Sequence, residues 1–201
     1  MIMQEIIINV ITHIATTVYR QFAAALLLAF LFMFVYLYAQ EHGWRKAIRS
    51  WKEEFACRRI FRNLFFLFFY ISMILLKTLL LREIWYTPWG KMAVGWGLTT
   101  ASGELTTESI ENIILFIPYT FLLLTVVQEQ VRGFRNMKLV RMVLWSAFAS
   151  FYFSLAIELC QGVFWLGTFQ WADLAYNTLG GMLGGIFRYL WLKIRKKWEK
   201  K

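Results

Sequence analysis

The stretch "ADLAYNTLGGMLGG", residues Ala172–Gly185, places an aspartate, an asparagine and four glycines at the start of a segment that is otherwise apolar. Residues three, four or seven positions apart share one face of a helix. Asp173 and Asn177 therefore share a face, which continues through Gly180, Gly184 and Arg188. Polar groups in an apolar helix usually turn toward the interior of a helix bundle. The stretch thus predicts a membrane helix that packs against others.

The composition points to the same class of protein. Hydrophobic residues make up 59% of the 201 residues and aromatic residues 19%, whereas soluble domains are roughly 45–50% apolar. The net charge of +10 does not indicate a nucleic-acid partner, because the basic residues fall in short connections between apolar runs, where they orient a membrane protein. The two cysteines form no disulfide framework or metal-ligand spacing. We expect no metal and no cofactor.

Five apolar runs approach the roughly 17–25 residues needed to cross ~30 Å of hydrocarbon. They cover residues 22–39, 60–81, 113–127, 142–159 and 174–192. The third run is short and contains Pro118, so we expect it to use flanking residues or to kink. Residues 1–201 are therefore predicted to form a single all-α membrane domain, a bundle of five transmembrane helices.

The residues before the first run carry a second helical signal. Apolar side chains recur there at steps of three and four, the spacing of one helical face. They are Ile7, Val10, Ile11, Ile14 and Val18. We expect an N-terminal amphipathic helix that lies at the membrane interface; the alternative is that it lengthens the first span.

The basic residues predict the orientation of the bundle. Segments 40–62, 128–141 and 188–201 hold 18 of the 22 Lys and Arg residues, whereas 82–110 holds two and 161–173 none. Cytoplasmic loops of membrane proteins carry an excess of Lys and Arg. The pattern therefore predicts an N-out/C-in topology.

With that topology, the polar residues of the spans gather in one layer near the outer surface. The layer comprises Lys77, Arg82, Glu111, Asn112, Glu158, Gln161, Asp173 and Asn177. A short loop joins the fourth and fifth spans into an antiparallel hairpin, which should bring Glu158 and Gln161 beside the start of the fifth span. Ionisable groups in membrane spans usually pair and mark function. We interpret the layer as a ligand site that opens to the outer leaflet.

Several of these residues also have simpler roles. Asp173 suits the first turn of the fifth helix, where a carboxylate complements free amides and the helix dipole; that role is compatible with one in a site. His13 and His42 are expected to be solvated or interfacial rather than to bind a ligand. Glycines four residues apart let membrane helices approach closely. The helix-packing glycines predicted in this way are Gly180, Gly181, Gly184 and Gly185.

The segment "SLAIELCQGVFWLGTFQWADLAYNTLGGMLGG", residues 154–185, resembles the signature of VanZ-like membrane proteins. The shared pattern is a Glu, a Gln three residues later, an Asp after a short loop, an Asn four residues on, and glycines. "TLLLRE" at 78–83 and "ENIILFIP" at 111–118 resemble earlier parts of the same family. The chain departs from the family at "LGT", 166–168, where many relatives have a basic residue, and at Tyr119-Thr120, where many have a glycine.

The family is named for a protein linked to teicoplanin resistance. The resemblance therefore implies a multi-pass protein of the bacterial plasma membrane and cell envelope that reduces sensitivity to glycopeptide-type antibiotics. Its expected partners are membrane lipids, together with a lipid-linked cell-wall precursor or a lipoglycopeptide. The residues of interest that the resemblance implies are Arg82, Glu111, Asn112, Glu158, Gln161, Asp173 and Asn177.

The alternative is a membrane-embedded hydrolase or transferase that acts on a lipid-linked envelope substrate. In such an enzyme Glu158 and Asp173 could divide general acid and base roles. The layer contains no Ser–His pair, no Cys with a base and no histidine ligand set, so we favour a binding protein. A transporter fits less well, because the chain has no visible internal repeat and its polar residues lie near one face of the membrane.

Overall fold

The computed structural model describes residues 2–38, 44–80, 89–90, 92–99, 103–165 and 167–199. These residues form helices and connecting segments, with one isolated β-bridge between Thr99 and Leu105 and no named strand. The elements are α1 (Ile2–Tyr38), α2 (Trp44–Cys57), α3 (Arg59–Leu75), the π-helix η1 (Leu76–Leu80), α4 (Glu108–Gln130), the 3-10 helix η2 (Arg132–Phe134), α5 (Leu139–Phe164) and α6 (Trp171–Trp198). The predicted all-α class is confirmed.

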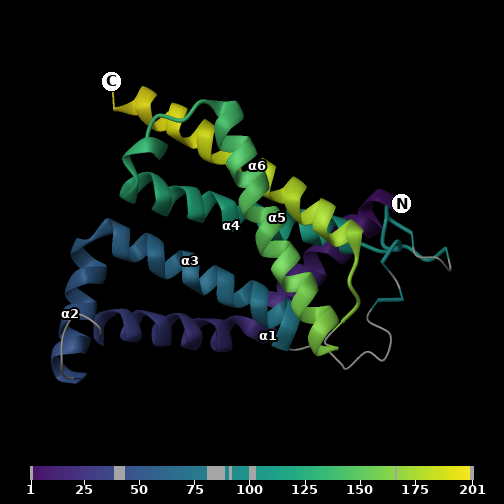
Figure 1. Ribbon diagram of the computed structural model, residues 1–201, viewed down its shortest axis with the longest axis horizontal. Helices are drawn as coiled ribbons and strands as arrows, with labels where there is room; N and C mark the ends of the chain where they lie inside the picture. Colours follow the sequence, from purple (N-terminus) through teal and green to yellow (C-terminus); the bar gives the residue numbers. More distant parts are fainter. Residues whose placement is uncertain are drawn as a thin grey trace.

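The chain crosses the bundle back and forth (Figure 1). Helices α1, α4 and α6 run in one direction, and α3 and α5 return in the other. As a result α2, η2 and the C-terminus lie at one end of the molecule, and the N-terminus lies toward the other. We term this end, with α2, η2 and the C-terminus, the basic end.

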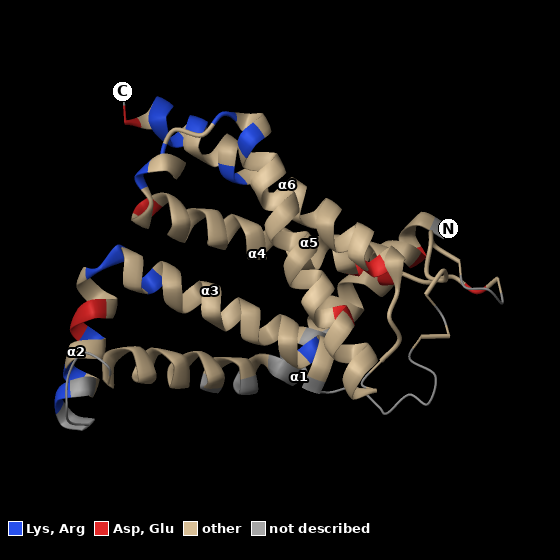
Figure 2. Cartoon of the chain, in the orientation of Figure 1, with Lys and Arg blue, Asp and Glu red and all other residues tan. Residues whose placement is uncertain are grey.

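Charge separates along the same axis. Lys and Arg gather at the basic end, on α2, around η2 and on the last turns of α6 (Figure 2). At the opposite end, the charged side chains of the described residues are mainly acidic. The described parts of the three segments rich in Lys and Arg, residues 44–62, 128–141 and 188–199, thus also lie together in space.

Three helical segments of the described chain are long and apolar enough to cross a membrane: Arg59–Leu79, Glu108–Gln130 and Leu139–Phe164. They correspond to the second, third and fourth predicted spans. The third, predicted over 15 residues, is a helix of 23 residues that contains Pro118, so it does use flanking residues. The described residues of the first predicted span, 22–38, lie within α1, and the fifth predicted span lies within α6; neither helix is among these three.

The N-terminal region differs from the preferred prediction. Residues 2–38 form the single helix α1, 37 residues long, instead of a separate amphipathic helix followed by a span. The physical reason is that this segment contains no glycine or proline to interrupt the helix. The helix continues through Arg20, so the N-terminal residues and the first predicted span share one helix. That these residues lengthen the membrane span itself stays a prediction.

Helix α6 packs between α4 and α5, and glycine makes this close approach possible. A methyl group at Gly180 would meet the carbonyl oxygen of Ile113, and one at Gly184 would meet Thr120 and the carbonyl oxygen of Ile117, all on α4. On the neighbouring face, Gly181 and Gly185 lie against Ser150 and Ser146 of α5. The two glycine pairs therefore serve two different helix contacts, as small residues do in membrane bundles.

The other half of the bundle is held by aromatic packing. Ala29, Met33, Leu37, Phe61 and Phe65 form a buried cluster between α1 and α3. Trp51 and Phe55 on α2 pack against this cluster, with the Trp51 and Phe65 rings in an edge-to-face arrangement at 6.1 Å. The basic segment between the first two predicted spans is thus an amphipathic helix, whose apolar face is anchored to α1 and α3.

Candidate functional site

The predicted polar layer divides into two groups in the structure. The first group links α5 and α6 with their neighbours and consists of Asn112, Glu158, Gln161, Asp173 and Asn177. The second group is centred on Glu111, which contacts Lys77 and His13. Arg82 lies outside the described residues. The first group consists of side chains that are buried or partly buried.

Asp173 lies in the first turn of α6, where its negative charge complements the helix dipole. Its Oδ1 atom accepts a hydrogen bond of 2.8 Å from Nδ2 of Asn112 on α4. The N-cap position itself belongs to Gln170, which makes no side-chain capping bond. Asp173 therefore supports the start of α6 and also joins it to α4.

Glu158 joins the two helices of the α5–α6 hairpin. Its side chain is only 2% exposed, and its Oε2 atom accepts a hydrogen bond of 2.9 Å from the backbone N–H of Gln170. Buried carboxylates need such donors because burial removes their hydration. Glu158 thus holds the residue immediately before α6 against the end of α5.

Gln161 and Asn177 add two further links. Nε2 of Gln161 donates to the carbonyl oxygen of Thr78 at 2.8 Å. Thr78 lies in the π-helix η1, a type of turn that is frequent at functional sites. Nδ2 of Asn177 donates to Oγ of Ser154 at 2.8 Å. Both contacts tie the hairpin into the bundle.

Three amide oxygens near this layer are buried with no hydrogen-bond partner in the described structure. They belong to Gln161, Gln170 and Asn177. Unsatisfied buried acceptors are uncommon in folded proteins, and each requires an explanation such as a bound water or ligand. The layer therefore has capacity for donors that the described side chains do not supply.

Glu111 forms the second group with residues from three elements. Its Oε1 atom accepts a hydrogen bond of 2.6 Å from Thr107 and lies 3.0 Å from Nδ1 of His13 on α1. Its Oε2 atom lies 3.4 Å from Nζ of Lys77 in η1. One carboxylate therefore connects α1, η1 and the start of α4.

His13 was expected to be solvated or interfacial, and it was not among the predicted site residues. Its side chain is largely exposed, and it also contacts Glu111. One sequence signal could have found it: Asn9 and His13 are four residues apart, so they share a polar face in a mostly apolar helix. That face meets the start of α4.

Glu111 lines two pockets of different character. The larger, of about 380 Å³, is predominantly polar and is lined by Asn9, His13, Leu105, Thr106, Thr107, Glu108 and Glu111. The smaller, of about 70 Å³, is mainly apolar and is lined by Ile14, Val18, Tyr70, Met73, Lys77, Glu111, Ile114 and Leu115. The carboxylate thus lies between a polar pocket and an apolar one, an arrangement that suits an amphiphilic ligand.

The hydroxyl of Thr120, one of the two residues at which the chain departs from the expected family pattern, donates to the carbonyl oxygen of Gly181 at 2.9 Å. This bond adds to the α4–α6 contact instead of contributing to either pocket. Within the described ranges, no group of three or more His, Cys, Asp or Glu side chains is arranged to hold a metal ion. The polar groups of this region are therefore suited to hydrogen bonding and ion pairing.

Comparison with known proteins identifies a family. The model of the VanZ/LLP1 family matches residues 22–192, which include α2 to α5 completely, the C-terminal part of α1 from Phe22 and most of α6. No curated protein and no solved structure matches the chain significantly. Because the family match covers most of the sequence, the chain belongs to the VanZ/LLP1 family.

Proposed function

We propose that this VanZ-family protein binds an amphiphile at the outer leaflet of the bacterial plasma membrane and thereby lowers sensitivity to glycopeptide-type, teicoplanin-like antibiotics. The observation that carries the proposal is the position of Glu111 between a polar and an apolar pocket. The ligand classes that fit are a lipid-linked cell-wall precursor and a lipoglycopeptide, since each joins a polar group to an apolar chain.

The proposal includes five membrane-spanning helices with the N-terminus outside and the C-terminus inside. Its support is the gathering of Lys and Arg at the basic end (Figure 2), which is the end expected to face the cytoplasm. The Glu111 pockets involve the N-terminal part of α1 and the start of α4, away from that end. They would therefore face the outer leaflet.

Each pocket offers a different kind of contact. The polar pocket presents the carboxylates of Glu108 and Glu111 together with Asn9 and Thr107, which suit hydroxyl, amide and amine groups. The apolar pocket presents Ile14, Met73 and Ile114, which suit the first part of a hydrocarbon chain. Glu111 is the residue best placed to contact the junction between the two parts of the ligand.

The first group of the layer would act as a positioning framework for this site. Asn112 follows Glu111 on α4 and is held by Asp173, and Gln161 bonds to Thr78, next to Lys77. Glu158 and Asp173 line neither pocket at Glu111. Since each already accepts a structural hydrogen bond, binding is better supported than acid–base catalysis by this pair.

The test compares strains that express wild-type protein, Glu111→Gln or Glu53→Gln at equal membrane levels. Glu53 is an exposed residue of α2 at the basic end, so it controls for loss of a carboxylate. The minimum inhibitory concentration of teicoplanin should rise with the wild type and Glu53→Gln, and should return toward the empty-vector value with Glu111→Gln. An unchanged value for Glu111→Gln rejects the site; no effect of the wild type rejects the function.

A further inference from the structure

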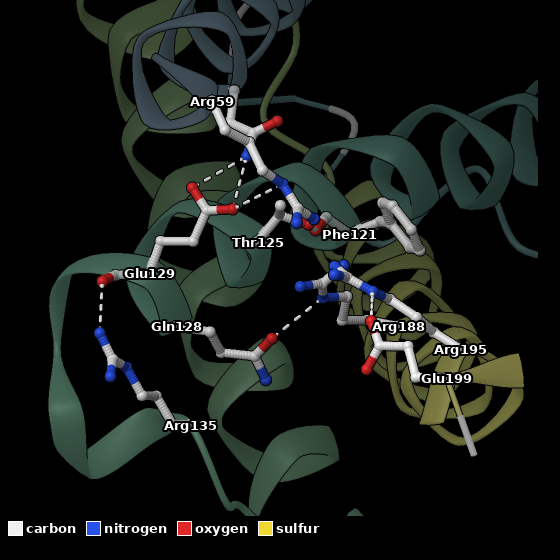
Figure 3. Close-up of polar contacts among 10 residues, drawn as sticks. Arg59, Phe121, Thr125, Gln128, Glu129, Arg135, Arg188, Arg195 and Glu199 are labelled. Carbon is white, nitrogen blue, oxygen red and sulfur yellow. Dashed lines mark hydrogen bonds and ion pairs between the residues drawn. The ribbon is translucent and has the colours of Figure 1, made fainter. Parts of the chain in front are cut away.

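Arg188 of α6 is a buried cation far from the Glu111 pockets. It is 4% exposed. Its Nε–H donates to Oε1 of Gln128 at 3.0 Å, and its guanidinium lies 5.5 Å from the centre of the Phe121 ring (Figure 3). Both partners belong to α4. The cation is therefore held between α4 and α6 by an amide and an aromatic ring.

No carboxylate of the described residues forms an ion pair with Arg188. Glu129 is close enough to act on its charge, and so are the cations Arg59 and Arg195. Glu129 already pairs with Arg59 at 3.1 Å and accepts from Asn63 at 2.9 and 3.0 Å. The carboxylate of Glu199 pairs with Arg195 at 2.7 Å (Figure 3). Three guanidinium groups thus share two carboxylates, which leaves excess positive charge at Arg188.

A buried charge without a counter-ion is costly, because burial removes its hydration and nothing offsets the loss. Gln128 adds a second unmet requirement: its Nε2 amide is buried and has no acceptor. Arg188 and Gln128 together therefore present N–H donors and a positive charge, and lack an anion with several oxygen acceptors. Phosphate has this chemistry, and arginine is the side chain that recognises it best.

The depth of Arg188 suits a lipid phosphate. It lies four residues before Leu192, the end of the fifth predicted span, or about 6 Å along the helix axis. The side chains of Arg59 and Arg195 are 48% and 45% exposed. Both lie close enough to Arg188 for their charges to act on it. Basic pockets between helices at the cytoplasmic side of membrane proteins bind anionic head groups. Those head groups are available in the leaflet at the basic end.

We propose that Arg188 and Gln128 form a binding site for the phosphate of an anionic membrane lipid, with Arg59 and Arg195 contributing at its edge. The site lies between α4 and α6, at the end of the bundle opposite the Glu111 pockets. It therefore rests on the topology proposed above, but not on the antibiotic-related function or on the Glu111 pockets.

The test measures phosphatidylglycerol binding to the purified full-length protein in neutral detergent, by native mass spectrometry and by the shift of the thermal unfolding midpoint. Wild-type protein should bind phosphatidylglycerol and unfold at a higher temperature with it. The affinity of Arg188→Met for phosphatidylglycerol should be lower by a factor of about ten or more, because the charge-assisted bonds are lost. Arg132→Gln, which removes an exposed arginine at the same end, should behave as the wild type.

A second variant tests the charge argument directly. Gln128→Glu places a carboxylate where the amide oxygen accepts from Arg188, so it supplies an internal counter-ion. It should unfold at a higher temperature than the wild type without lipid, and should lose the shift that phosphatidylglycerol causes. This variant decides the question even if Arg188→Met does not fold.

Inorganic phosphate serves as the parallel probe for a soluble anion. A wild-type shift with phosphatidylglycerol that phosphate does not reproduce identifies a lipid ligand, and a shift with phosphate alone shows that a soluble anion occupies the site and overturns the lipid assignment. If Gln128→Glu and Arg188→Met retain the full wild-type response to phosphatidylglycerol, the site does not exist.

Discussion

Asn112 on α4 donates a 2.8 Å hydrogen bond to Asp173 in the first turn of α6, across 61 positions of sequence. The bond joins the two helices that also make the close contact at Gly180 and Gly184. Asn112 directly follows Glu111, so this bond helps to set the position of the carboxylate between the two pockets.

Asp173→Ala should lower the free energy of unfolding by about 1–3 kcal/mol, because Asn112 loses its acceptor and the helix loses a favourable charge at its N-terminus. Asp173→Asn keeps an oxygen that can accept from Asn112, so its loss should be smaller. Thermal unfolding in detergent measures both. Equal losses for the two variants would show that the hydrogen bond contributes nothing.

Gly180→Ala should destabilise the protein by about 1–3 kcal/mol, since the added methyl group meets the backbone of Ile113, which cannot move aside as a side chain can. Gly133 is the matched control: nothing lies within 4 Å of a Cβ added there. The unfolding midpoint of Gly133→Ala should stay near the wild-type value. A Gly180→Ala protein as stable as that control contradicts the close α4–α6 contact.

Glu158→Ala should accelerate hydrogen exchange at the backbone amide of Gln170, because this amide donates to the Glu158 carboxylate. Glu158→Gln retains an acceptor oxygen and should cause a smaller acceleration. Hydrogen–deuterium exchange with fragment analysis of the segment before α6 measures the effect. Unchanged exchange in Glu158→Ala would remove Glu158 from its proposed role in fixing the α5–α6 hairpin.

Cysteine labelling in intact cells tests the proposed topology. In a Cys57→Ser, Cys160→Ser background, Glu104→Cys should react with a membrane-impermeant maleimide added outside, because the segment before α4 is expected to face outward. Arg132→Cys, at the basic end, should react only after the membrane is permeabilised. The reverse pattern, or equal labelling of both, rejects the N-out/C-in orientation.

Much of the fold could be predicted because it depends on local or averaged properties. The described residues of all five apolar runs are helical, as their length predicted. The short run around Pro118 was expected to use its neighbours or to kink, and it does use its neighbours. The continuity of α1 was not the preferred prediction. A face of apolar residues at helical spacing indicates a helix, but it does not indicate whether the next helical segment begins a new element.

The candidate site was predictable only in part. Helical spacing places Asp173 and Asn177 on one face, yet their partners, Asn112 and Ser154, depend on how α6 is rotated against α4 and α5. The same limit explains His13: nothing near it in sequence shows that α1 passes beside Glu111. The basic segment at α2 was assigned to one side of the membrane, and its helical form was not anticipated.

The amino-acid sequence alone determined the membrane class, the helical segments and the separation of basic from acidic connections, because these follow from hydrophobicity, periodicity and charge along the chain. Only the tertiary structure decided which polar groups meet. It separated Glu111 from the Asp173 group and joined it to His13 and Lys77. It also placed Arg188 beside Gln128, with no ion pair to a carboxylate among the residues that the structure describes. The physical reason is that a helical pattern specifies a face, whereas helix packing specifies what that face contacts.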